Sequence, residues 1–127
     1  MKKELLVLRL GWNDHYRIKS ASSNTFEIIG MFLTTDYYVY GLSFLIEWIN
    51  DPMQDGTNAN ITYLEKKDKT ISLGDLLWEK GMPFVELKFS IDSFIKFLND
   101  WEKIQKQKPK EIVITKNGDE IKIEGKN

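Results

Sequence analysis

The spacing of apolar residues predicts an amphipathic helix over about residues 90–107. Ser90 is a good N-cap residue, and Pro109 ends the segment because proline has no amide hydrogen to donate and restricts the residue before it. Between them, apolar side chains recur every three or four positions, which is the spacing of one helix face: Ile91, Phe94, Ile95, Leu98, Trp101 and Ile104.

A β-hairpin is predicted over residues 111–124. Apolar and polar residues alternate on both sides of Asn117-Gly118, and Asn-Gly is typical of a two-residue type I′ turn, whose central residues both need positive φ. Such a turn fixes the register, so four isoleucines share one face, with Ile114 opposite Ile121 and Ile112 opposite Ile123. Because the helix and the hairpin each have one apolar face, we expect them to pack on each other.

The remaining pattern predicts mainly short strands. They are expected at residues 4–10, 15–19, 61–65, 70–73 and 83–89, with a second hairpin around Lys66–Lys69. Residues 37–49 are rich in aromatic and β-branched residues and are predicted mainly as strand, with a helix from Leu42 onward as the alternative.

A second helix is favoured over residues 25–34, because Glu27 follows Asn24 by three positions, as in a capping box; a strand is the alternative. Residues 51–60 are predicted as a loop, and residues 74–81 as a turn or short helix. Together these elements indicate a single α+β domain over residues 1–127, built mostly from antiparallel sheet.

Length and composition narrow the class of protein. A chain of 127 residues can bury a core without covalent staples, and the absence of cysteine excludes disulfides and thiolate metal sites. The apolar run Leu5–Leu8 is too short and too charged at its flanks for a signal peptide, and no run approaches the roughly 18 apolar residues of a membrane span. We therefore expect a soluble cytoplasmic protein with no membrane contact.

Charge is distributed unevenly along the chain, although the net charge is only −1. No basic residue occurs between Lys19 and Lys66. Clustered carboxylates attract a cationic partner and disfavour other partners, and Tyr and Trp are frequent interface anchors. The residues of this interval that we predict to bind a partner are Glu27, Asp36, Tyr40, Glu47, Trp48, Asp51, Asp55 and Glu65. The alternative is a solvated surface over a buried aromatic strand.

No pattern of catalytic or metal-binding residues is present. His15 is the only histidine, and Asp14 beside it would point to the opposite face of a strand. A calcium loop starting at Asp51 would place Met53 and Thr62 at ligand positions. No phosphate-binding glycine motif occurs, and a pI of about 5.9 without a basic-aromatic motif argues against nucleic acid. We therefore predict a protein that is not an enzyme and needs no metal or cofactor.

The stretch SIDSFIKFLNDWEKIQKQKPKEIVIT, followed by the Asn-Gly hairpin, resembles small bacterial immunity proteins of contact-dependent or polymorphic toxin systems, mainly over residues 82–124. The resemblance implies a compact cytoplasmic domain that neutralises one cognate toxin, often a basic nuclease. The acidic interval would then face the toxin. Two rivals stay open: an adaptor that forms a homodimer through an exposed strand edge, and a small enzyme that uses Asp51 and Asp55 as paired carboxylates.

Overall fold

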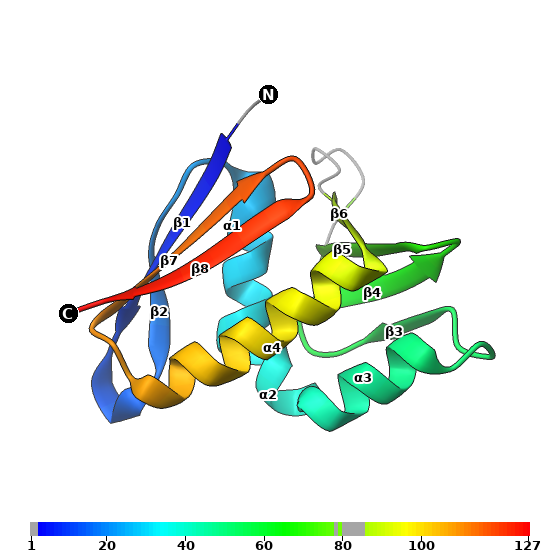
Figure 1. Cartoon of the computed structure of the whole chain (residues 1–127), viewed down its shortest axis with the longest axis horizontal. Helices are drawn as coiled ribbons and strands as arrows, with labels where there is room; N and C mark the ends of the chain where they lie inside the picture. Colours follow the sequence, from blue (N-terminus) through cyan, green and yellow to red (C-terminus); the bar gives the residue numbers. More distant parts are fainter. Residues whose placement is uncertain (1–2, 78, 80–85) are drawn as a thin grey trace.

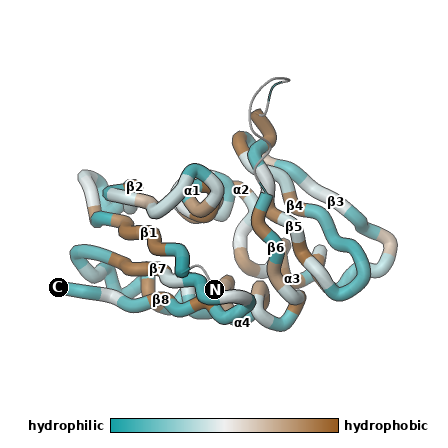
Figure 2. Tube along the Cα trace, turned by 90° about the horizontal axis from the view of Figure 1, so that it is seen from above, coloured by the Kyte–Doolittle hydropathy of each residue, from teal (hydrophilic) through white to brown (hydrophobic). Residues whose placement is uncertain are grey.

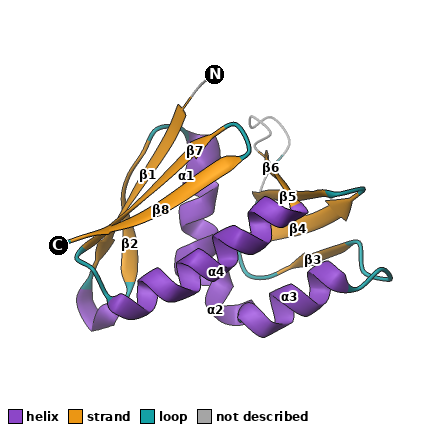
Figure 3. Cartoon of the chain, in the orientation of Figure 1, coloured by secondary structure: helices purple, strands orange, loops and turns teal. Residues whose placement is uncertain are grey.

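The computed structural model describes residues 3–77, 79 and 86–127 and contains two antiparallel sheets and several helices (Figures 1 and 3). The first sheet has the strand order β2-β1-β7-β8, with bounds Tyr16–Ala21, Lys3–Leu10, Glu111–Asn117 and Glu120–Lys126. The second has the order β3-β4-β5-β6, with bounds Gly56–Asn58, Thr62–Lys67, Thr70–Asp75 and Glu86–Ser90. The α+β class is confirmed, and the strands divide between two sheets.

The helices connect and cover these sheets. Their bounds are α1 Asn24–Met31, a π-helical turn Phe32–Asp36, α2 Tyr37–Tyr40, α3 Leu42–Asn50 and α4 Ile91–Gln107, with a short 3-10 turn at Trp12–Asp14. The two sheets lie toward opposite ends of the molecule, and α4 runs past both of them (Figures 1 and 2). Buried side chains from both sheets and from the helices form one continuous hydrophobic cluster.

Helix α4 matches its prediction closely. The Ser90 hydroxyl caps it by accepting a hydrogen bond from the Ser93 amide at 3.2 Å, and Lys108 adopts a left-handed conformation (φ 52°) just before Pro109. The buried face carries Phe94, Phe97, Leu98 and Trp101, and the helix contacts β8 as expected, together with α3, β5 and β6.

The C-terminal hairpin forms, but its predicted register is wrong. The turn residues are Gly118 and Asp119, and only Gly118 has positive φ (64°), as in a type II′ turn. The Asp119 carboxylate accepts hydrogen bonds from the Ser90 amide at 2.9 Å and the Ser90 hydroxyl at 2.7 Å, which ties the turn to the start of α4. Across the new register the four isoleucines still share one face, with Ile114 opposite Ile123, Ile121 opposite Lys116, and Ile112 opposite Gly125.

Residues 24–50 are helical, so the helix predicted over 25–34 is confirmed and the strand predicted over 37–49 is wrong. The N-cap of α1 is Ser23, whose hydroxyl accepts from the Phe26 amide at 3.1 Å, one residue before the predicted Asn24. The helical segment turns by 90° at Gly41, which has a φ of 78°. Leu45, Trp48 and Ile49 are buried at helical spacing, so the aromatic and branched residues cover the core from a helix.

The other strands mostly follow the sequence. Predicted strands 4–10, 15–19, 61–65 and 70–73 correspond to β1, β2, β4 and β5, and the Lys66–Lys69 hairpin is present. The predicted loop 51–60 contains the short edge strand β3. The predicted strand 83–89 is described only from Glu86 onward, as β6, and most of the predicted turn 74–81 lies outside the described residues apart from Gly74–Leu77 and Glu79.

Candidate partner-binding surface

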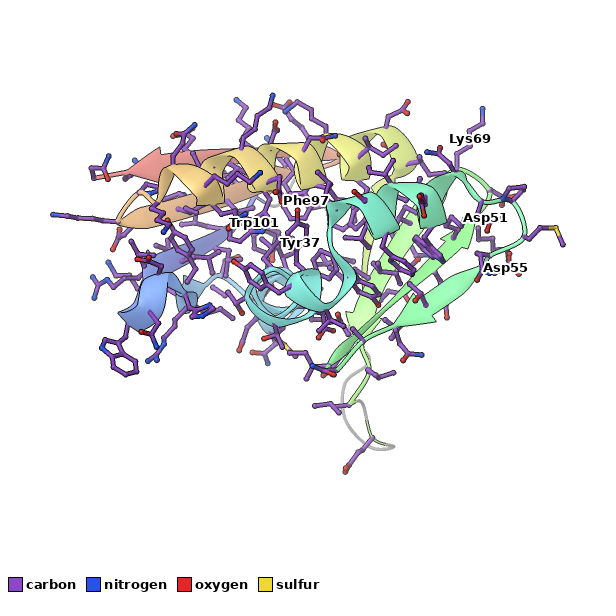
Figure 4. All side chains as sticks on the ribbon, turned by 90° about the horizontal axis from the view of Figure 1, so that it is seen from below. Tyr37, Asp51, Asp55, Lys69, Phe97 and Trp101 are labelled. Atoms are coloured by element: carbon purple, nitrogen blue, oxygen red, sulfur yellow. The ribbon has the colours of Figure 1, made fainter. Side chains whose placement is uncertain are left out.

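Four of the predicted carboxylates come together at the end of the molecule formed by α3, β3 and β4. Glu47 lies in α3, Asp51 is the C-cap of that helix, Asp55 precedes β3, and Glu65 in β4 pairs with Gly56 of β3. We call these four residues the acidic surface. Figure 4 shows Asp51 and Asp55 near each other at this end, well away from Trp101.

A shallow groove of about 190 Å³ separates α3 from β3. It is lined by Phe44, Glu47, Trp48, Asp51, Gln54 and Thr57. Asp51 Oδ1 accepts a hydrogen bond from the Met53 amide at 2.9 Å, and within the described part of the chain neither carboxylate of the groove forms an ion pair. The groove therefore presents two carboxylates that are not in ion pairs with any described residue.

Asp55, Gly56 and Glu65 line a second concavity. Lys66, Lys67 and Asp68 complete its lining. The Asp55 carbonyl also accepts the Lys66 amide at 2.7 Å, which fixes the loop before β3 against β4. Because lysines lie among these carboxylates, the charge is mixed here and most negative in the neighbouring groove.

The Lys66 side chain reaches into the α3 end of the acidic surface, where backbone carbonyls accept its hydrogen bonds. Its ammonium group donates to the carbonyls of Trp48, Ile49 (3.4 Å) and Asp51 (2.7 Å) and lies 4.8 Å from the centre of the Trp48 ring. The last carbonyls of a helix carry partial negative charge and lack partners within the helix. The lysine therefore caps α3 and leaves the carboxylates of Glu47 and Asp51 unpaired.

Asp36 was predicted to bind a partner, and the structure excludes that role because the side chain is fully buried (0% exposed). Its Oδ1 accepts from the Asn60 amide at 3.1 Å, and its Oδ2 accepts from the amide of Thr62 at 2.7 Å and from the Thr62 hydroxyl at 2.5 Å. The Ile61 amide donates to both carboxylate oxygens. Asp36 therefore fixes the segment between β3 and β4 to the helical layer.

The structure also places the other three predicted residues. Glu27 is exposed in the first turn of α1, 14 residues before the bend at Gly41. Fourteen helical residues span about 20 Å, so Glu27 lies apart from the acidic surface. Trp48 is only 3% exposed and forms the floor of the groove, so a partner could contact it only from within the groove. Tyr40 is half-buried and stacks on Phe44 at 5.6 Å between ring centres; burial raises its pKa to about 12.

The sequence missed the apolar part of this surface. Phe44 is 44% exposed and Met53 is 86% exposed. Phe44, Glu47 and Asp51 follow the three-and-four spacing of one helix face, so the signal was present but is visible only when residues 42–50 are treated as a helix.

A second polar cluster joins α2 to α4. The Tyr37 hydroxyl donates to the Glu102 carboxylate, and Lys106 forms an ion pair with Glu102 at 3.0 Å. Burial, with the carboxylate beside it, raises the pKa of Tyr37, while the phenol hydrogen bond and Lys106 lower the pKa of Glu102. These groups are paired with one another and serve the packing of α2 on α4.

Within residues 3–77, 79 and 86–127, no group of three or more His, Cys, Asp or Glu side chains could hold a metal ion. In that same part of the chain no single helix is long and apolar enough to cross a membrane. Comparison with protein-family models, with curated proteins and with solved structures finds no match to this chain.

Proposed function

We propose that this protein is an immunity protein, which binds a basic cognate toxin through the acidic surface and neutralises it without chemistry of its own. The observation that carries the proposal is the convergence at one end of the fold of Glu47, Asp51 and Asp55, none of which forms an ion pair within the described residues. The resemblance of residues 82–124 to such proteins supports the same conclusion.

The surface has the composition of a docking site. Carboxylates at a rim steer an oppositely charged protein and raise its association rate. Exposed Phe44 and Met53 add apolar area among them, and the buried contacts of an interface supply most of its affinity. The surface is also held firmly, because Lys66 caps α3 and Asp36 fixes the segment that leads into β4. A rigid surface loses little conformational entropy when it binds.

Binding of this protein over the active site of the toxin would be enough to inhibit the toxin. A toxin that acts on nucleic acid carries positive charge at its active site, since phosphate contacts need Lys and Arg. A protein that covers this charge with carboxylates blocks the substrate from the same groups. The protein itself then needs no catalytic residue, metal or cofactor.

The test uses the toxin encoded beside the gene and two matched triple variants. Glu47→Lys/Asp51→Lys/Asp55→Lys reverses the acidic surface, and Glu27→Lys/Asp92→Lys/Glu124→Lys makes the same change in net charge at exposed positions elsewhere. The first variant should lower the association rate at least tenfold at low salt, as expected for rim charges, and abolish protection of cells against the toxin. The second should bind within about threefold of the unmodified protein.

Equal weakening by both variants would mean that net charge, and no particular surface, drives binding. Unchanged affinity of the first variant would refute the proposal, as would a failure of the unmodified chain to protect cells from the neighbouring toxin.

A further inference from the structure

The groove between α3 and β3 combines three features that suit one kind of side chain. Two carboxylates, Glu47 and Asp51, stand one helical turn apart on its rim, with an aromatic ring, Phe44, one turn earlier. The Trp48 ring forms its floor. The volume of about 190 Å³ accommodates a side chain and is too small for a helix or a strand.

Guanidinium fits these features better than ammonium does. It is planar, it binds carboxylates through two parallel hydrogen bonds, and it stacks on aromatic faces while it is weakly hydrated. An ammonium group is compact and strongly hydrated, and it satisfies carbonyl cages of the kind that Lys66 already fills at the C-terminus of α3. The carbonyl groups at the end of α3 therefore favour an ammonium group, whereas the groove beside them favours a guanidinium group.

The two aromatic side chains of the groove, Phe44 and Trp48, are held in position by their neighbours. Phe44 stacks on Tyr40 with an angle of 9° between the ring planes, and Trp48 is held from one side by the Lys66 ammonium at 4.8 Å. The Trp48 indole Nε1 is buried and has no hydrogen-bond partner within the described residues. Because Trp48 lines the groove, its indole N–H signal serves as a probe for a group that enters the groove.

Building on the proposed function, we infer that the groove receives an arginine side chain of the partner. Its guanidinium lies against Phe44 and donates hydrogen bonds to the carboxylates of Glu47 and Asp51. The arginine is then the central anchor of the complex, and the remaining acids of the surface act as a rim.

The experiment uses short peptides as probes, so it does not depend on the toxin. The peptides Ac-Gly-Arg-Gly-NH₂ and Ac-Gly-Lys-Gly-NH₂ are titrated into the ¹⁵N-labelled protein, and the indole Nε1–H signal of Trp48, assigned with Trp48→Phe, is followed. The arginine peptide should shift this signal saturably, and the lysine peptide should bind at least fivefold more weakly.

Two variants localise the effect. Glu47→Gln/Asp51→Asn should remove the saturable shift, while Asp92→Asn/Glu124→Gln, which makes the same charge change at exposed positions outside the acidic surface, should leave it within twofold. A linear response, equal binding of both peptides, or equal loss in both variants would overturn the inference. If the arginine peptide binds as expected and the toxin does not, the proposed function is refuted and the arginine site is kept. If the toxin binds and the peptide does not, the arginine site is refuted and the proposed function is kept.

Discussion

Replacing the buried carboxylate of Asp36 tests whether one side chain holds the second sheet to the helices. In Asp36→Ala, the amides of Asn60, Ile61 and Thr62 and the Thr62 hydroxyl lose their acceptor. Only the two Thr62 donors are fully buried, since the Asn60 and Ile61 amides lie at partly buried positions that water reaches more readily.

The magnitude follows from that count. A buried donor left without a partner costs about 1–3 kcal/mol, so the two Thr62 donors predict a loss of about 3–4 kcal/mol in the free energy of unfolding. For a chain of this size, that corresponds to a fall of roughly 10–15 °C in Tm. Such a loss is a large part of the 5–15 kcal/mol that stabilises a typical domain, so the variant is best studied at low temperature.

Urea unfolding followed by tryptophan fluorescence and circular dichroism gives the measurement. Thr62→Val, which removes only the hydroxyl, should cost about 1 kcal/mol, and a double-mutant cycle with Asp36→Ala should show at least about 1 kcal/mol of coupling. Asp55→Ala, at an exposed carboxylate, should change stability by less than about 0.5 kcal/mol. A loss below about 1 kcal/mol for Asp36→Ala, or an absence of coupling, would refute the reasoning.

Three further substitutions test other contacts. Lys66→Met should lower the free energy of unfolding by about 2 kcal/mol, because it leaves the last carbonyls of α3 without their charged donor, as urea denaturation will measure. Gly74→Ala should cost about 2–3 kcal/mol, since a Cβ there would lie 2.2 Å from the Tyr63 ring, and Tyr63→Ala should restore part of the loss in the double variant. Tyr37→Phe should make the stability of the protein less sensitive to acid. The pKa of Glu102 is lowered in the folded state, so the ionised carboxylate stabilises the fold above about pH 4.5, and this stabilisation is lost as the pH falls below that value. The loss of unfolding free energy between pH 6 and pH 2 should therefore be smaller in the variant.

Each of these has a control. Lys67→Met, next to the capping lysine and exposed, should be nearly neutral, and an equal effect of both lysines would exclude the helix cap. Gly56→Ala places its Cβ no closer than 3.5 Å to a neighbour, so it should be tolerated. An unchanged pH profile in Tyr37→Phe would mean that the phenol does not set the affinity of Glu102 for protons.

Local signals explain which parts of the fold could be predicted. The cap at Ser90, the periodic apolar face and Pro109 act within one helix, so α4 could be placed to within a residue. The alternating strands β1, β4 and β5 could be placed to within two residues. The hairpin register was missed because the bonds from Ser90 to Asp119 join residues 29 apart and override the local preference of Asn-Gly.

The candidate surface depended on contacts that no local pattern carries. Asp36 is acidic and lies in an acidic interval, yet its partners are 24–26 residues further on, so its burial could not be seen. Aromatic and β-branched residues in 37–49 favour strand locally, and the burial of Leu45, Trp48 and Ile49 on the helical layer outweighs that preference. Glu47, Asp51, Asp55 and Glu65 do lie at one end of the fold, because they are close together in the chain or joined by one sheet pairing, and their binding of a partner stays a prediction.

The passage of α4 along both sheets has a consequence for how the molecule comes apart. Phe94, Phe97, Leu98 and Trp101 belong to a cluster that includes buried residues of each sheet, so displacing the helix opens the core of both sheets at once. Slow amide exchange in β1 and in β5 should therefore report the same opening event, with one protection energy. Either half of the chain, expressed alone, would lack part of the residues that cover its core. Only a mixture of the two halves should recover the native circular dichroism spectrum.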